Sequence, residues 1–256
     1  MKKIIIIIFL FIFTSNYAQS SESCKGYKKL SKDYLKCLGE KLKNKSTNVG
    51  LDTSNIKEKK TIAIIGNNTP RWTLSEIAVQ SLGGVPLGLY SDALESEIIY
   101  LLDYTDCRTI FVEDEEQADK IMSLPNSKSK IDLIIYDEPK GMNKYKDNRL
   151  IAYKDLIEIG SKSKKINNNL YHKMIDRISE DDTSIFCPTS GTTAHPKLAM
   201  ISHKSLLNHA KNYLIADPKD SSDEYVSVLP LPWIMEQTYS VAKWCLCRMK
   251  VNFVEE

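Results

Sequence analysis

Short apolar runs alternate with segments of helical periodicity along the chain from residue 61 onward. The runs are rich in β-branched residues and stop at turn residues, as TIAIIG (61–66) does, so they predict buried strands. We predict six strands, near 61–66, 85–89, 109–113, 132–137, 184–188 and 225–229. Continuous apolar strands that alternate with amphipathic helices are typical of an α/β fold in which helices cover both faces of a parallel sheet.

The segments between these strands predict helices. We expect them after Pro70, over 94–106, over 115–124, from Ser202 as a capping residue, and over 233–250. Residues 140–182 are more polar and predict an exposed connection around SKSKKINNNLYHK (161–173). VNFVEE (251–256) begins a further strand.

The first residues have a different character. Ile4 to Phe13 is an unbroken apolar run of ten residues behind Lys2 and Lys3, and Ala18 closes the segment. Such a run is too short to span a bilayer and predicts a cleaved signal-like segment over 1–19, with 20–256 as the domain. A hydrophobic anchor or a mis-assigned start is the alternative, so the localisation stays open between secretory export and a cytoplasmic or membrane-associated protein.

Charge is nearly balanced, since the 256 residues include 35 Lys and Arg against 33 Asp and Glu. This balance gives no reason to expect nucleic acid as a partner. The local exception is the segment 25–60, which holds eleven lysines. It predicts a solvated helical face or a weak contact with an anionic membrane surface.

Cysteine and histidine spacing predicts no metal site. The chain has six cysteines and four histidines, and Cys245 and Cys247 stand too close together for the usual zinc pair. Several cysteines lie within apolar segments, which favours buried thiols over a disulfide framework.

The most polar stretch that follows a predicted strand is CPTSGTTAHPKLAMISH (187–203). Hydroxyl side chains crowd around Gly191, and Lys197 follows. A strand, a loop of Gly, Ser and Thr, and then a helix can present N–H groups and hydroxyls to phosphate oxygens. The spacing differs from that of a Walker loop, and on composition alone an ordinary turn is the alternative.

A resemblance favours the phosphate loop. TSGTTAHPKLAMISH (189–203) resembles the phosphate-loop signature of the adenylate-forming enzymes, the acyl-CoA synthetase superfamily. Other segments resemble further parts of that family in the same order: TIAIIGNNTPRW (61–72), GGVPLGLYSDALESEIIYLLDYTDCRTIFVED (83–114), IIYDEPKGMNKYKDNRL (134–150), LPLPWIMEQTYSVAKWCLC (229–247) and VNFVEE (251–256). The likeness covers about residues 57–256 and is greatest to bacterial-type long-chain fatty acid–CoA ligases.

The resemblance implies a fold, a reaction and a set of ligands. The fold would be the N-terminal part of an adenylation domain, and the reaction the ATP-dependent conversion of a long-chain fatty acid to acyl-adenylate and then acyl-CoA. ATP, Mg²⁺ and coenzyme A would be needed. The residues carried over for the ATP phosphates are Thr189, Ser190, Gly191, Thr192, Thr193 and Lys197. Trp233 stands where the family lines its acyl pocket, with plain core packing as the alternative.

The sequence departs from the family pattern at two glycine positions. Ala194 and Leu198 replace them, which predicts an impaired loop. The resemblance also stops before the family's metal-binding glutamate, ribose-binding aspartate and C-terminal catalytic lysine, so we expect no catalytic residue within the chain. Two hypotheses follow: part of a ligase that is inactive alone, or a non-catalytic, exported remnant or binding protein of the same fold.

Overall fold

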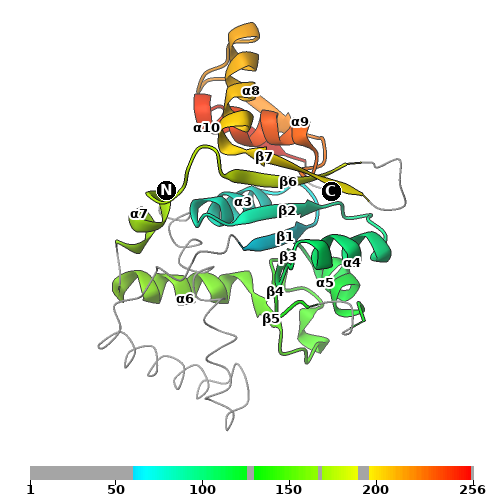
Figure 1. Ribbon diagram of the computed structural model, residues 1–256. Helices are drawn as coiled ribbons and strands as arrows, with labels where there is room; N and C mark the ends of the chain where they lie inside the picture. The colour runs from blue at the N-terminus through cyan, green and yellow to red at the C-terminus, as the bar shows by residue number, and fades with distance from the viewer. Residues whose placement is uncertain (1–59, 126–129, 167–168, 190–195, 255–256) are drawn as a thin grey trace.

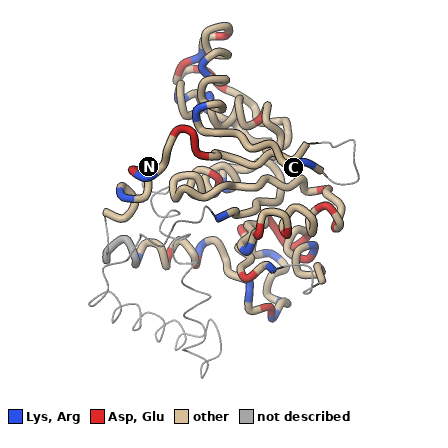
Figure 2. The backbone as a smooth tube through the Cα atoms, viewed as in Figure 1, with Lys and Arg blue, Asp and Glu red and all other residues tan. Residues whose placement is uncertain are grey.

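The computed structural model describes residues 60–125, 130–166, 169–189 and 196–254, with side chains up to 162 in the second range (Figure 1). The signal-like segment 1–19 and nearly all of the Lys-rich segment 25–60 lie outside this part of the chain. Charged residues of both signs are interspersed along the described backbone (Figure 2), as the balanced composition predicts.

The centre of the molecule is a seven-stranded sheet in the order β5-β4-β3-β1-β2-β6-β7. The strands are β1 (Thr61–Ile65), β2 (Val85–Leu89), β3 (Thr109–Val112), β4 (Leu133–Tyr136), β5 (Leu150–Ala152), β6 (Thr183–Thr189) and β7 (Lys197–Ser202). Every neighbouring pair is parallel except β6 and β7. The predicted α/β fold is thus confirmed.

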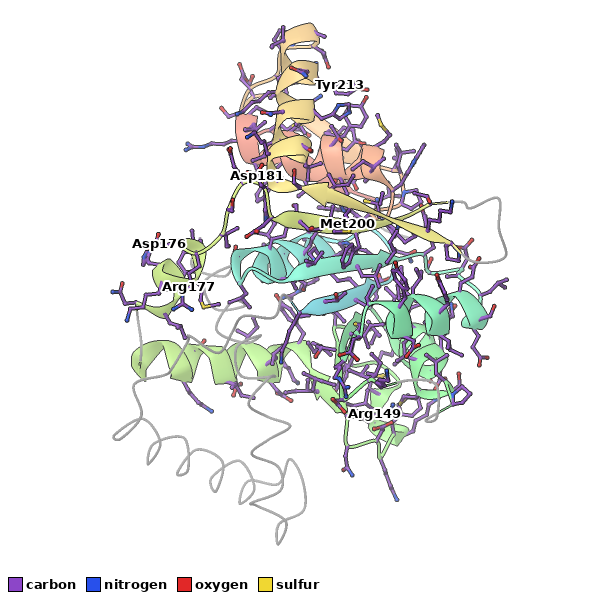
Figure 3. All side chains as sticks on the ribbon, viewed as in Figure 1. Arg149, Asp176, Arg177, Asp181, Met200 and Tyr213 are labelled. Atoms are coloured by element: carbon purple, nitrogen blue, oxygen red, sulfur yellow. The ribbon has the colours of Figure 1, made fainter. Side chains whose placement is uncertain are left out.

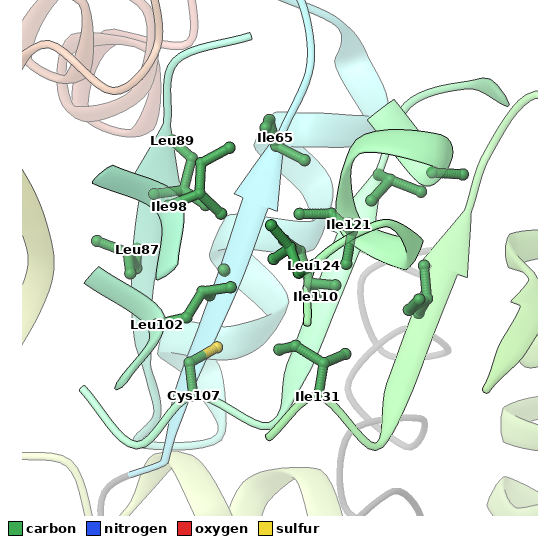
Figure 4. Close-up of a cluster of buried hydrophobic side chains, with 14 of the residues drawn as sticks. Ile65, Leu87, Leu89, Ile98, Leu102, Cys107, Ile110, Ile121, Leu124 and Ile131 are labelled. Carbon is green, nitrogen blue, oxygen red and sulfur yellow. The ribbon is translucent and has the colours of Figure 1, made fainter. Parts of the chain in front are cut away.

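Helices cover both faces of this sheet (Figure 1). The covering helices are α3 (Pro70–Ser81) and α6 (Tyr153–Ile166) on one face and α4 (Glu95–Tyr104) and α5 (Glu115–Met122) on the other, with a short 3-10 turn, η3, at Met142–Lys144. α7 (Leu170–Ile175) packs with Leu82 after α3, and α8 (His203–Ala216) follows β7 and packs with Ala242. Successive side chains of a strand point to opposite faces. Ile62 and Ile64 of β1 therefore pack toward α3 and α6, whereas Ala63 and Ile65 pack toward α4 and α5 (Figure 4).

The segment 140–182 differs from its prediction. We expected an exposed connection around 161–173, but α6 and α7 occupy much of it. The exposure is as expected at Lys162, Asn169, His172 and Lys173, but the stretch is largely helical, and Leu170 and Met174 of α7 pack with Leu82. Just before it, Tyr153 and Leu156 of α6 are buried against the sheet. The polar residues between these apolar positions hid the helical periodicity.

The stretch after the predicted phosphate loop also differs. We predicted a strand, a loop and then a helix, but a strand, β7, comes before the helix and pairs antiparallel with β6. The predicted loop therefore connects the two strands of a hairpin, and α8 begins only after β7. The predicted cap is confirmed one element later, because the Ser202 hydroxyl accepts from the N–H of Ser205 at 3.1 Å at the start of α8.

A second, two-stranded sheet pairs β8 (Glu224–Ser227) in parallel with β9 (Lys250–Phe253). Between them runs one helical segment, made of α9 (Ile234–Glu236), the π-helix η4 (Gln237–Ala242) and α10 (Lys243–Cys247). The predicted final strand and long helix are both present. None of the described helices is both long and apolar enough to cross a bilayer.

Candidate functional site

A cavity of about 480 Å³ lies where β2, α4, the β6–β7 hairpin and the start of α9 meet. Its lining comes from three regions: Leu89, Tyr90, Ala93, Glu97 and Leu101 from β2 to α4, Cys187, Pro188, Thr189, Pro196, Ala199 and Ile201 from the hairpin, and Trp233 with Ile234. The residues that flank the predicted phosphate loop therefore line the same cavity as Trp233. The lining is mainly apolar, which suits a hydrocarbon ligand.

The hairpin brings Thr189 and Lys197 together at the base of the predicted phosphate loop. They form the last pair of the β6–β7 ladder, and the Thr189 hydroxyl donates to the Lys197 carbonyl oxygen at 3.2 Å. Both residues are exposed, so the ammonium group is accessible to an anion, whereas the Thr189 hydroxyl must give up this hydrogen bond to donate to one. The other predicted phosphate ligands, Ser190, Gly191, Thr192 and Thr193, and the departure Ala194 lie outside the described residues.

Leu198, the second departure, has a packing role. It pairs with Pro188 in the hairpin, and its partly buried side chain joins the apolar cluster beneath α4 and α5. Its neighbour Met200 is 68 % exposed at the sheet edge (Figure 3). A leucine at this place therefore stabilises β7 against the core.

Trp233 is not a core residue. Its side chain is 44 % exposed and lines the cavity, so the alternative of plain core packing does not hold. Its backbone N–H donates to the Pro230 carbonyl oxygen at 2.9 Å, and its carbonyl oxygen accepts from the N–H of Gln237 at 3.2 Å. The backbone of Trp233 is thus held at the junction of a tight turn and a helix.

Two residues far away in the sequence hold this turn. The Asn68 amide donates to the Leu229 carbonyl oxygen at 2.6 Å and accepts from the N–H of Leu231 at 3.0 Å. Pro232 packs so closely on β2 that a Cβ atom at Gly88 would lie 2.9 Å from its Cα. The Trp233 turn is therefore seated against the end of the sheet.

Burial favours the neutral form of two polar side chains that line the cavity, Cys187 and Tyr90. Burial, followed by the nearby Glu76, raises the pKa of the Cys187 thiol to about 12. Burial also raises the pKa of Tyr90, with Cys187 and Asp92 acting in the same direction. Glu97 is already engaged, since its carboxylate accepts from the N–H of Leu94 at 3.3 Å.

Sequence reasoning missed a buried carboxyl behind the cavity. Glu76 on α3 is 1 % exposed and accepts from Trp72 Nε1 at 3.3 Å and from Gln237 Nε2 at 2.9 Å. Burial raises its pKa to about 7, although these hydrogen bonds act to lower it. The available signal was its spacing, because Trp72, Glu76 and Val79 share one helical face.

A second hollow of about 360 Å³ lies beside α3 and α6. Its charged groups already contact one another: Arg71 pairs with Asp137 at 3.4 Å and lies 4.7 Å from the ring centroid of Tyr153. No residue predicted for the site lines it. Within the described ranges no group of three or more His, Cys, Asp and Glu side chains could hold a metal ion, so Mg²⁺ is assigned no ligand among them.

These features match a known family. Residues 47–256 match the AMP-binding enzyme family, and the chain belongs to it. Similar curated proteins include a chloroplastic long-chain-fatty-acid–[acyl-carrier-protein] ligase, AEE15, of Arabidopsis thaliana, 25 % identical over 71 % of this chain and 26 % of the relative. The long-chain-fatty-acid–CoA ligase ACSBG1 of Rattus norvegicus is 29 % identical over 70 % of this chain and 25 % of the relative. The chain thus spans about a quarter of these relatives' length.

Solved structures show the same fold. The luciferase-like enzyme from the mealworm Zophobas morio has a TM-score of 0.59 at 22 % identity, over 84 % of this chain and 47 % of that enzyme. ATP-bound MatB from Rhodopseudomonas palustris has a TM-score of 0.58 at 15 % identity, over 78 % of this chain and 35 % of MatB. The architecture is therefore that of adenylation domains of the acyl-CoA synthetase and luciferase type.

Proposed function

We propose that this chain is the N-terminal part of an enzyme that activates a long-chain fatty acid with ATP. A carboxylate oxygen attacks the α-phosphorus of ATP, the bond to the β-phosphate breaks, and pyrophosphate leaves. The acyl-adenylate then passes its acyl group to the thiol of coenzyme A, with release of AMP. The observation that carries the proposal is the single cavity bordered by both the phosphate hairpin and Trp233.

The proposed roles follow from this arrangement. The ATP phosphates are held by Thr189, Ser190, Gly191, Thr192, Thr193 and Lys197, and Trp233 lies against the acyl chain. Lys197 supplies a positive charge and Thr189 a hydroxyl at the hairpin base. The apolar lining between Leu101 and Ile201 would cover hydrocarbon, which gains roughly 0.8 kcal/mol per buried methylene group.

Turnover is proposed to need more than this chain. The family resemblance assigns the metal-binding glutamate, the ribose-binding aspartate and the mobile lysine to segments after β9. Groups that stabilise a transferring phosphate act together, and part of the set gives little of the effect. We therefore expect the 256-residue chain alone to bind ligands without forming acyl-adenylate. A non-catalytic binding protein of the same fold is the second candidate, supported by the departures at Ala194 and Leu198.

Binding measurements on the 256-residue chain test the two halves of the site separately. A fluorescent polyene fatty acid reports acyl binding, and calorimetry with ATP and Mg²⁺ reports nucleotide binding. Trp233→Ala should weaken fatty-acid binding about tenfold and leave ATP binding unchanged. Lys197→Ala should weaken ATP binding roughly three- to tenfold and leave fatty-acid binding unchanged.

Matched controls are Trp244→Ala, a tryptophan outside the cavity lining, and Lys140→Ala, an exposed lysine of the loop after β4. Neither should change either affinity. If Trp233→Ala leaves fatty-acid affinity intact, the acyl half of the proposal is wrong. Fatty-acid-dependent release of pyrophosphate by the 256-residue chain would contradict the expectation that it lacks turnover.

A further inference from the structure

The carboxyl group of Glu76 lies behind the cavity and accepts hydrogen bonds from three side chains. Gln237 Nε2 donates at 2.9 Å, Trp72 Nε1 at 3.3 Å and Gln80 Nε2 at 3.4 Å. Both Glu76 and Gln237 are essentially without solvent contact. All three partner atoms are N–H donors, and the two carboxyl oxygens of Glu76 accept from them.

One of these partners reaches the Trp233 wall of the cavity. Gln237 Nε2 donates to the Leu231 carbonyl oxygen at 2.7 Å as well as to Glu76. Leu231 precedes Trp233 by two residues, and the N–H of Gln237 donates to the Trp233 carbonyl oxygen. The amide of Gln237 therefore ties this wall to α3, and Glu76 orients that amide.

Another partner reaches the hairpin wall. Gln80 Nε2 donates to both the carbonyl oxygen of Ser184 at 3.2 Å and its hydroxyl oxygen at 3.1 Å. Ser184 lies on β6, three residues before Cys187, which lines the cavity. The same carboxyl group therefore connects to the strand that leads into the phosphate loop.

We propose that Glu76 is a positioning residue that holds the Trp233 wall and the hairpin wall of the cavity at a fixed separation. The two walls are far apart in the sequence and are joined here through one buried group. As a statement about ligand binding, this inference rests on the proposed function. The connection between the two walls does not depend on the proposed function, because it follows from the hydrogen bonds of Glu76, Gln80 and Gln237.

Three variants separate the branches of this network. Gln237→Met keeps the side-chain length but removes both hydrogen bonds of the Trp233 branch, and should weaken fatty-acid binding about tenfold with ATP binding unchanged. Gln80→Met removes the β6 branch and should weaken ATP binding about three- to tenfold with little effect on the fatty acid. Glu76→Gln turns an NH₂ group toward N–H donors, and should weaken both.

A double-mutant cycle distinguishes positioning from general loss of stability. In a Trp233→Ala background, Glu76→Gln should cause no further loss of fatty-acid affinity, because the wall it positions has lost its contact. Ile135→Val on β4, a buried position away from the cavity, is the control for lower stability and should leave both affinities unchanged. Equal, additive losses from all variants would overturn the proposal.

A ligand-free measurement decides the inference even if neither probe binds. In a Trp244→Phe background, acrylamide quenching reports Trp233, since Trp72 is only 2 % exposed. Gln237→Met should make the Trp233 emission more quenchable, whereas Gln80→Met should leave it unchanged. Unchanged quenching in Gln237→Met would refute the positioning role. Absence of binding by the unmodified chain, with the expected quenching, would refute only the proposed function.

Discussion

Gly88 and Pro232 lie so close that no side chain fits between them. An added Cβ atom at Gly88 would lie 2.9 Å from the Pro232 Cα and 3.2 Å from its Cβ. Because Gly88 is the next-to-last residue of β2 and Pro232 precedes Trp233, this contact sets the distance between the end of the strand and the tryptophan turn.

Gly88→Ala should therefore destabilise the fold and displace the turn. We expect a loss of about 1–3 kcal/mol, as for other overpacked positions, and weaker fatty-acid binding. Urea denaturation measures the loss. Gly83→Asn is the control, because Gly83 has a φ of 75°, which Asn tolerates, and the nearest atom to an added Cβ is 3.9 Å away. An unchanged urea midpoint for Gly88→Ala would contradict the observed contact.

Glu76 should make stability depend on pH near neutrality. Its pKa rises from 4.5 to about 7 on folding, chiefly through burial, so the folded state holds this proton more tightly than the unfolded state. This contribution is fully present below pH 4.5 and is lost as the pH rises through 7, a change of about 3 kcal/mol at most. Urea unfolding at pH 5 and pH 7.5 should show a larger difference for the unmodified chain than for Glu76→Gln.

Leu198→Gly should lower stability without restoring a phosphate loop. The substitution removes a partly buried side chain from the cluster under α4 and α5 and places glycine in a strand. We expect a loss of about 1–3 kcal/mol in the free energy of unfolding. Met200→Gly, with a side chain that is 68 % exposed on the same strand, should show a smaller loss. If Leu198→Gly raises the affinity for ATP, the effect of Leu198 on the phosphate loop is larger than its contribution to packing.

Thiol reactivity should follow burial. The thiols of Cys107 and Cys187 are buried and their pKa is raised to about 12, chiefly by that burial, so few thiolates form at pH 8. Cys245 is exposed at its surface, although burial of part of the thiol's surroundings raises its pKa to about 11, and Cys247 is partly exposed. Among the four cysteines of the described ranges, peptide mass spectrometry after brief alkylation should find Cys245 and Cys247 modified first, with Cys107 and Cys187 labelled only in denaturant. Early labelling of Cys107 would indicate local opening of the core.

The sequence predicted the fold better than the site's supporting contacts. All six predicted strands are present, because each contains a short apolar run bounded by polar or turn residues. β5 has only three residues and was missed, and β7 was missed because LAMI after Pro-Lys resembles the lead-in to a helix. The π-helix at Gln237–Ala242 gives no distinct periodicity within a segment that was correctly expected to be helical.

Candidate site residues were found only where a local motif marks them. The hairpin base at Thr189 and Lys197 and the cavity residue Trp233 stand in contiguous stretches that resemble family motifs. Glu76 and Asn68 were missed, since their partners Gln237 and Leu231 lie about 160 residues further along the chain. Hydrogen bonds over such separations leave no trace in one sequence except an unexplained polar residue on an apolar face.

The strand order has a consequence for how the polypeptide folds. Strands β1 to β5 are consecutive in the chain and adjacent in the sheet, whereas β6 must return to β2, where Phe186 pairs with Leu87. Closing so long a loop is entropically costly and slow compared with forming the local βαβ contacts. We expect the five-stranded part to form first and the hairpin to dock last. The cavity would then be absent from early folding intermediates, and ligands would act on a late step.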